Sequence, residues 1–371
     1  MNKYRLAATP FAILDRMGFA PRPRQPVAYV VEAANWATRW DGILVNRGIE
    51  KLAPGKSRVV ESPATLAHSL VHFFSHYQWL AWQPWLAGSN RFVVTFYHGK
   101  REDDAESARL IDAFLATVPR IERIVTSARL VEERLVAWGV PRSKIVRIPI
   151  PIDLDVFKPA TAAERVAARL KLGLPDGHLV VGSFQKDGVG WGDGQKPKLV
   201  KGPDILIETL KHVARERPVV ALLTGPARGY VTSGLAAAGI LFKHVYVDDY
   251  EQLPAYYAAL DVYLNPSREE GGPKGVLESM ATNVPVVSSR VGMAPDLITH
   301  AVSGFLAGPS DSAALATAVL EAANLGPRAE ALLQNARTAV SVCGVDVVAK
   351  MHWQHLIAPL LAEVDDHDRG R

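Results

Sequence analysis

The segment from Asn265 to Val287, NPSREEGGPKGVLESMATNVPVV, constrains the fold of this chain more than any other. It follows a short apolar strand at residues 261–264 and passes through a turn rich in glycine and proline. It then continues into the apolar pattern of a helix. Pro273 suits the first turn of that helix, where its missing N–H leaves no hydrogen bond unmade. A strand that leads through such a turn into a helix is the repeating unit of an α/β sheet.

Three glycines and two glutamates suggest the chemistry of this segment. Gly271, Gly272 and Gly275 would let backbone amides approach a ligand closely, because glycine has no Cβ. A glycine-rich turn that opens a helix favours an anion, since unpaired N–H groups and the helix dipole point at the same place. Glu270 and Glu278 are unsuited to that anion but suit sugar or ribose hydroxyls beside it. The pattern therefore predicts a phosphate site flanked by carboxylates, as a nucleotide sugar requires.

The segment also resembles the E-x7-E signature of retaining glycosyltransferases, in particular glycosyltransferase family 4, whose members have the GT-B fold. The matching positions are Pro266, Ser267, Glu270, Gly271, Glu278, Met280, Ala281, Pro285, Val286 and Val287. The departures from the family pattern are Gly272, Pro273, Ser279 and Asn283. The resemblance implies that Glu278 holds the ribose hydroxyls and that Glu270 lies beside the donor sugar. The alternative is an ordinary strand, turn and helix with a weak Lys274–Glu278 surface pair.

A second segment, residues 125–159, resembles the same family. It reads VTSARLVEERLVAWGVPRSKIVRIPIPIDLDVFKP, and the matching positions are Ser127, Leu135, Gly139, Val140, Pro141, Lys144, Ile145, Pro149, Asp153, Phe157 and Pro159. Ile150-Pro151 stands where the family has Asn-Gly, which stiffens the chain there. This segment is expected to close a first domain, with Lys158-Pro159 at the start of the link to a second.

The cations expected to bind a donor diphosphate lie between residues 186 and 201. By the resemblance, Lys201, directly before an expected helix at 204–213, is one phosphate ligand. Ser183 stands where the family has an arginine, and Lys186 is the nearest substitute. Residues 187–198 form an insertion with four glycines in seven residues, so a mobile loop is expected there rather than a regular element.

Two further candidates follow expected strands. The strand at 92–97 ends in His98-Gly99, and the carboxyl ends of strands are where open α/β sheets bind ligands. By the resemblance, His98 faces the donor sugar from the first domain. In the second domain, Gly225 matches a family glycine at a strand end near the donor, while Arg228 is compatible with a surface charge.

The N-terminal region resembles the family poorly. A strand at 27–31 and a helix ending near Leu52 open a Rossmann-like unit, but no G-x-G-x-x-G follows the strand. A dinucleotide oxidoreductase therefore loses its main support. Trp36, Arg39 and Asp41 are candidates for the acceptor side, or they pack the loop against its domain.

Three features of the same region raise membrane or metal interpretations. The aromatic run at 77–86 could lie at a membrane interface, but it lacks a cationic face, which favours a buried crossover helix. Residues 1–26 have some signal-like character without a clear cleavage site, so a poorly structured or surface-packed lead-in is expected. His68, His72 and His76 recur every four residues, but no nearby Cys, Asp or Glu completes a metal site.

Composition narrows the class of protein. A chain of 371 residues suggests two domains, and its single cysteine, Cys343, indicates a reducing compartment, here the cytoplasm. A net charge of +4 is too small to argue for nucleic acid. The same mild excess leaves open a peripheral contact with the cytoplasmic membrane face.

These features predict an α/β protein of the GT-B class, with two doubly wound Rossmann-like domains facing a central cleft. The expected division is an acceptor-side domain at 1–158, a donor domain at 159–345, and a C-terminal helix at 346–371 that crosses back to the first domain. The expected activity is a retaining hexosyl transfer from a nucleotide-diphosphate sugar to a glycan or lipid-linked acceptor of envelope polysaccharide biosynthesis. No cofactor or metal is expected beyond the donor. Two alternatives remain open, a nucleotide-sugar epimerase or hydrolase of the same fold and a non-catalytic GT-B scaffold.

The absence of paired acidic residues at an expected strand end predicts that a chelator leaves the activity intact. Lysines are present where a metal would otherwise offset the phosphate charge. Turnover of a nucleotide-diphosphate sugar should therefore persist in EDTA. Complete loss of activity in EDTA, restored by Mg²⁺ or Mn²⁺, would contradict this expectation.

Overall fold

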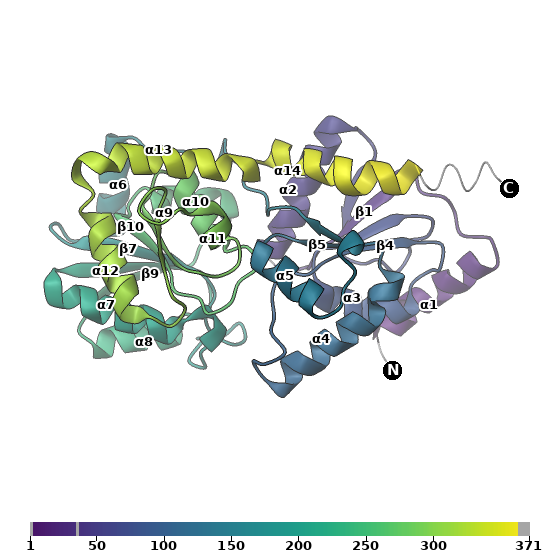
Figure 1. The fold of residues 1–371 in the computed structure, drawn as a ribbon, viewed down its shortest axis with the longest axis horizontal. Coiled ribbons are helices and arrows are strands. Elements are labelled where there is room, and N and C mark those ends of the chain that lie inside the picture. Colours follow the sequence, from purple (N-terminus) through teal and green to yellow (C-terminus); the bar gives the residue numbers. More distant parts are fainter. Residues whose placement is uncertain (1–2, 35–36, 363–371) are drawn as a thin grey trace. The chain divides into compact units, whose positions relative to one another are not determined.

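The structure is a computed structural model that describes residues 3–34 and 37–362. The chain divides into two compact units (Figure 1). The first contains Met1–Pro151 together with Cys343–Arg371, and the second contains Ile152–Val342. Each unit has its own six-stranded sheet, and every strand pair in both sheets is parallel. Parallel strands need crossover connections, which is why helices alternate with strands along the chain.

The sheet of the first unit has the strand order β2-β1-β3-β4-β5-β6. Its strands are β1 (Val27–Val30), β2 (Ser57–Val60), β3 (Leu70–Phe73), β4 (Arg91–Thr95), β5 (Arg123–Thr126) and β6 (Ile145–Arg147). The α-helices of this unit are α1 (Lys3–Arg16), α2 (Ala37–Leu52), α3 (His76–Trp82), α4 (Ala105–Thr117), α5 (Arg129–Ala137) and α14 (Val345–His352). A π-helical turn, η8 (Trp353–Ile357), continues α14.

The C-terminal segment packs closely on the first unit. Gly48 of α2 faces Ala349 of α14, and a Cβ at position 48 would lie 2.5 Å from the Ala349 methyl group. Val348, Ala349, Leu356 and Ile357 join the core that β1, α2 and β3 form. A glycine at position 48 thus allows the two helices to touch along their backbones.

The N-terminal lead-in is a helix, so the expectation of a poorly structured segment is wrong and the surface-packed alternative holds. Helix α1 lies against α3 and the 3₁₀ turn η1 (Gln83–Trp85). The Tyr4 ring meets the Trp82 ring edge-on, with 4.6 Å between centroids. Trp79 and Trp82 are buried, as the crossover interpretation of the aromatic run expects. None of the described helices is long and apolar enough to cross a membrane.

The sheet of the second unit has the order β12-β11-β10-β7-β8-β9. Its strands are β7 (Leu179–Phe184), β8 (Val219–Thr224), β9 (Leu241–Val245), β10 (Val262–Asn265), β11 (Val286–Ser289) and β12 (Phe305–Ala307). Its α-helices are α6 (Ala162–Leu172), α7 (Pro203–Glu216), α8 (Gly229–Ala237), α9 (Pro254–Tyr257), α10 (Lys274–Ala281), α11 (Ala294–Leu297), α12 (Ser312–Ala323) and α13 (Ala329–Val340). Short 3₁₀ turns η4 (Leu199–Lys201) and η5 (Tyr250–Gln252) precede α7 and α9.

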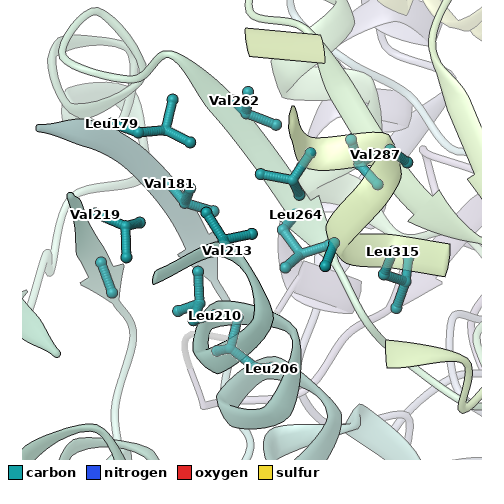
Figure 2. Packing of buried hydrophobic residues seen from close by; sticks show 14 of the residues in the cluster. Leu179, Val181, Leu206, Leu210, Val213, Val219, Val262, Leu264, Val287 and Leu315 are labelled. Atoms are coloured by element: carbon teal, nitrogen blue, oxygen red, sulfur yellow. The ribbon is translucent and has the colours of Figure 1, made fainter. Parts of the chain in front are cut away.

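The core of the second unit lies between this sheet and helices α7 and α12 (Figure 2). Helix α7 directs Leu206, Leu210 and Val213, spaced by four and three residues, onto β7 and β8. Burying each such side chain stabilises the fold by about 1.5–3 kcal/mol. Leu264 and Val287 extend the same core across β10 and β11. The apolar interior thereby fixes the strands whose ends carry the candidate site.

The expected strands fall on the interior of each sheet, and the corrections concern the edges. Strands β2, β6 and β12 lie at sheet edges and were not expected from the sequence. The remaining edge strand, β9, occupies Leu241–Val245. Edge strands are short and partly exposed, so they lack the continuous apolar run that identifies a buried strand.

Three buried histidines of the first unit predict that its stability falls in mild acid. Burial lowers the pKa of His76 and of His352 to about 3, and lowers the pKa of His72 well below its usual value. Below the ordinary histidine pKa of about 6.5, the unfolded chain binds protons that the folded chain does not. Each histidine should then cost about 1.4 kcal/mol per pH unit as the pH falls from 6.5 toward 4.

Urea unfolding followed by tryptophan fluorescence at pH 7.5 and pH 5.5 measures this loss. His352→Leu should flatten the pH dependence, whereas His355→Leu, an exposed histidine three residues later, should leave it unchanged. Equal free energies of unfolding at the two pH values would refute the prediction.

Candidate functional site

The candidate site lies at the point where the strand order of the second sheet reverses. Strands β7 and β10 are neighbours there, and the chain leaves them in opposite directions toward β8 and β11. Open α/β sheets bind ligands beyond the carboxyl ends of strands at such a point. Gln185 directly follows β7, and Asn265 is the last residue of β10. The segments that follow these two strands carry the predicted site residues.

Lys201 and Glu270 form the centre of this site. The Lys201 Nζ lies 2.7 Å from the Glu270 Oε1, and the Ser267 hydroxyl donates to the same oxygen at 2.8 Å. The Lys201 side chain is 25% exposed and that of Glu270 is 9% exposed, so the pair lies just below the surface. Two residues 69 positions apart in sequence are thus joined in a partly desolvated charge pair.

Several contacts fix the Lys201 segment against β10. Gly202 has a φ of 66°, and a Cβ there would lie 2.1 Å from the carbonyl oxygen of Pro266, so only glycine fits. The Gln185 amide donates to the Lys201 carbonyl at 2.9 Å. Arg268 donates to both carboxylate oxygens of Asp204 at 2.8 and 2.6 Å, and these hydrogen bonds lower the pKa of Asp204. A bidentate pair of this kind fixes orientation as well as distance.

Glu278 is held by two tyrosines that sequence reasoning missed. Tyr250 donates to the Glu278 Oε1 at 2.8 Å, and Tyr257 donates to the Oε2 at 2.7 Å. Glu278 is buried in the middle of α10, and burial raises the pKa of Tyr257 well above its usual value. Nothing in the spacing of Tyr250 and Tyr257 from Glu278 marks them as its partners. If Glu278 binds ribose hydroxyls as predicted, it must do so while it still accepts from both tyrosines, or the ribose must displace one of them.

Two glycines of the motif have close neighbours. A Cβ at Gly275 would lie 1.9 Å from the Tyr263 hydroxyl, so this glycine makes room for a strand side chain beneath α10. The Gly271 carbonyl accepts from the Met293 N–H at 2.9 Å, which ties the turn to the loop after β11. Gly272, in the same turn, is partly exposed. Their predicted approach to a phosphate stays a prediction.

Arg228 is buried, so a surface role for it is wrong. Its guanidinium donates to the carbonyl oxygens of Ser183 and Gln185, each at 2.8 Å, and to that of Thr224 at 3.2 Å. It also pairs with the buried Asp187 carboxylate at 3.2 Å. Burial raises the pKa of Asp187, and the positive charge of Arg228 opposes that rise. Arg228 thus joins the carboxyl ends of β7 and β8 beside Gly225, whose φ of 92° leaves its Cβ position 2.7 Å from the Gln185 carbonyl oxygen.

The glycine-rich insertion contains no helix or strand, as expected, and it is folded against this buried pair. Its expected mobility stays a prediction. Gly188 and Pro197 form an antiparallel bridge, and the N–H groups of Gly229 and Tyr230 donate to the carbonyls of Asp193 and Gly194. A Cβ at Gly194 would lie 2.1 Å from the Ala227 carbonyl oxygen. Gly188 and Gly194 thus serve close packing against the turn after β8, whereas Gly190 and Gly192 have open space at their Cβ positions.

Three lysines give this region its positive charge. The Lys186 ammonium lies 4.0 Å from the centre of the exposed Trp191 ring, at the tip of the insertion. Burial and the neighbouring charges of Lys186 and Lys201 lower the pKa of Lys198. Lys198 was not selected from the sequence, but its ammonium group is electrostatically coupled to those of Lys186 and Lys201. A concentration of cations beside a carboxylate suits a dianionic group with a hydroxyl-rich neighbour.

His98 belongs to the first unit. It follows β4, is half-buried, and its charge contributes to lowering the pKa of His76. Arg39 and Asp41 lie in helix α2, where Arg39 pairs with Glu61 at 2.6 Å and Asp41 accepts from the Tyr97 hydroxyl at 3.0 Å. Trp36 lies outside the described residues. The role of His98 toward a donor sugar stays a prediction of the resemblance.

No group of three or more metal-binding side chains gathers anywhere in residues 3–34 and 37–362. The His68, His72 and His76 series is dispersed by the fold. His72 lies on β3 and shares a hydrogen bond of 2.8 Å with the Thr95 hydroxyl, while His76 packs on Phe96 at the start of α3.

Comparison with known proteins identifies similar chains. The family profile described as "Glycosyl transferases group 1" matches residues 194–324. A D-inositol 3-phosphate glycosyltransferase of Segniliparus rotundus is 30% identical over 333 residues, which cover 82% of this chain and 67% of the relative. The lipopolysaccharide core biosynthesis mannosyltransferase LpsB of Rhizobium meliloti is 29% identical over 199 residues, which cover 52% of this chain and 49% of the relative. The match to a D-inositol 3-phosphate glycosyltransferase of Streptomyces avermitilis spans 56% of that relative.

Two solved structures share the fold. The Anabaena protein HepE, solved with UDP-glucose, superposes with a TM-score of 0.72 at 17% identity, covering 91% of this chain and 99% of HepE. The sucrose-phosphate synthase of Thermosynechococcus elongatus superposes with a TM-score of 0.70 at 21% identity, covering 91% of this chain and all of that one. The predicted GT-B class, with two Rossmann-like parallel sheets and their helices, is confirmed.

The buried Arg228–Asp187 pair predicts a large loss of stability when one partner is removed. Arg228→Met leaves the Asp187 carboxylate buried without a cation, which typically costs about 3–5 kcal/mol. Chemical denaturation of the variant measures the loss. The control, Arg215→Met on the exposed side of α7, should change the free energy of unfolding by about 0.5 kcal/mol or less. A change at Arg228 as small as in the control would show that the pair contributes nothing.

Proposed function

The chain belongs to the group 1 glycosyltransferases, and we propose that it moves a hexosyl group from a nucleotide-diphosphate sugar to an acceptor with retention of configuration. The observation that carries this proposal is the Lys201–Glu270 pair beyond the ends of β7 and β10. A cation for the diphosphate and a carboxylate for the sugar then lie 2.7 Å apart in one partly buried site.

In the proposed reaction, the bond between the anomeric carbon and the diphosphate oxygen breaks. Its electron pair leaves on the diphosphate, while an acceptor hydroxyl forms the new bond on the same face of the sugar. The hydroxyl proton passes to the departing phosphate. Lys201 stabilises the negative charge that grows on that phosphate, and Lys186 and Lys198 add to the same field. Such stabilisation is often the largest single contribution to catalysis.

Donor binding requires a change in the charge pair. In the described state Lys201 is engaged by Glu270 and Ser267 shares the same carboxylate oxygen. A diphosphate competes with Glu270 for the ammonium group, which frees the carboxylate for the hydroxyls of the transferred sugar. Glu278 holds the ribose hydroxyls, with Tyr257 fixing its orientation. These roles are supported by the geometry around each side chain and by the resemblance of the segment from Asn265 to Val287.

The substrate classes rest on relatives. Relatives are named for transfer to inositol phosphate and to the lipopolysaccharide core, and a protein of the same fold holds UDP-glucose. We therefore take a nucleotide-diphosphate hexose as the donor and a glycan or lipid-linked acceptor of envelope polysaccharide biosynthesis. The three lysines near the phosphate position support a reaction that needs no metal.

The test combines a panel of nucleotide-diphosphate hexoses with product analysis. A new glycosidic bond of the donor's anomeric configuration, observed by NMR, supports retaining transfer. Epimerised or free sugar would instead indicate the nucleotide-sugar epimerase or hydrolase. If no nucleoside diphosphate or nucleotide sugar binds in calorimetry, the result would favour the alternative of a non-catalytic GT-B scaffold.

Removal of the Lys201 ammonium should lower turnover far more than stability. Lys201→Ala should reduce kcat by about 10²–10³-fold, the usual cost of losing one group that stabilises transition-state charge. Lys211→Ala, an exposed lysine on the following helix, should leave kcat unchanged. Full activity in Lys201→Ala, or equal losses in both variants, would remove Lys201 from the reaction.

A further inference from the structure

Helix α1 and the turn after it present an apolar face to solvent. Leu6, Ile13, Leu14, Met17 and Phe19 are between 42% and 69% exposed. Leu6, Pro10, Ile13, Leu14 and Met17 follow the i, i+4, i+7, i+8, i+11 spacing of one helix face. Gly18, with a φ of 78°, ends the helix, and the Phe19 N–H donates to the Leu14 carbonyl at 2.9 Å. The turn thereby keeps Phe19 beside the last turn of the helix.

The opposite side of the same helix attaches it to the first unit. Tyr4 contacts Trp82, and Phe11 packs on the small apolar cluster of Ala20, Ala67 and Ala87. Asp15 accepts from the Ser89 backbone N–H at 3.1 Å. A helix that is apolar on both sides is normally buried on both sides. Since only one side of α1 is covered by the described chain, the other side fits a further partner.

The exposed charges of the first 26 residues are mainly positive. The exposed cations are Lys3, Arg5, Arg16, Arg22 and Arg24, of which Arg5 lies over the Trp85 ring on the covered side. The one acidic residue in the first 26 positions of the sequence is Asp15. Its side chain is only 5% exposed and contacts Ser89. An apolar stripe on a segment whose exposed charges are cations is complementary to a surface that is apolar at depth and anionic above.

We propose that this α1 face, defined as Leu6, Ile13, Leu14, Met17 and Phe19 together with the exposed cations of residues 3–24, docks on the surface of an anionic lipid bilayer. The apolar side chains enter the boundary between headgroups and acyl chains, and the cations meet lipid phosphates. A second copy of the chain fits less well, because it would bring five more cations against these five. The proposal stands on this surface alone and does not depend on the transferase reaction.

Flotation of the full chain with lipid vesicles tests the proposal. Binding is expected to vesicles of phosphatidylcholine and phosphatidylglycerol in equal amounts, and to be much weaker with phosphatidylcholine alone. The double variant Ile13→Asp with Phe19→Asp should lower the bound-to-free ratio by about tenfold or more, because two apolar anchors are lost. Arg16→Glu with Arg24→Glu should lower it by at least about fivefold per cation removed. Leu170→Asp, at a leucine of α6 that is 75% exposed, is the matched control and should bind like the wild type.

The substituted side chains are exposed, so unchanged circular dichroism and melting temperature are expected for every variant. Wild-type binding by the Ile13→Asp, Phe19→Asp variant would overturn the proposal, as would equal binding to the two kinds of vesicle. Light scattering without lipid tests whether a second copy of the chain occupies this face instead. A wild-type dimer that the same double variant converts to monomer would make the α1 face a contact between copies and would also overturn the proposal.

Discussion

The parallel pairing of β7 with β10 is the contact on which the candidate site depends. Val181 lies opposite Val262, and Gly182 lies opposite Tyr263. A Cβ at Gly182 would lie 2.3 Å from a Leu260 methyl group. The glycine therefore leaves room for the side chain of Leu260, which precedes β10, to pack on β7. Because both strands run in the same direction, their carboxyl ends share one edge. Two segments remote in sequence are delivered to that edge, and Lys201 and Glu270 meet there.

Beneath that edge, a buried guanidinium stabilises the backbone that carries the cations. Arg228 hydrogen-bonds three carbonyl groups at the ends of β7 and β8, and its pairing with Asp187 fixes the first residue of the insertion. The insertion then returns through Lys198 to Lys201. A buried charge pair that costs desolvation thus supports the segment that carries these lysines. This arrangement attaches the start of a stretch with four glycines in seven residues to the ends of β7 and β8.

The first unit meets a different constraint at α1. The helix has two apolar sides, and the protein uses only one of them for its own packing. The side chains on the other side are too exposed to stabilise the fold, so their pattern is better explained by a partner.

The central strands and the main site segment could be predicted from sequence because their information is local. Strands buried on both faces read as continuous apolar runs, and a glycine-rich turn between a strand and a helix marks an anion site within a few residues. Lys201, Glu270 and Glu278 were selected on such segments, together with the family resemblance. The predicted alternation of strands and helices then led to two doubly wound sheets, as observed.

Only the tertiary structure decided which of these residues touch. The Lys201–Glu270 pair, the two tyrosines on Glu278 and the burial of Arg228 against Asp187 each join residues from 21 to 69 positions apart. Their spacing in sequence carries no signal, because strand order and the packing of helices on the sheet set these distances. The edge strands β2, β6 and β12 were not predicted for a related reason, since a partly exposed strand is defined by its neighbour and not by its own apolar pattern.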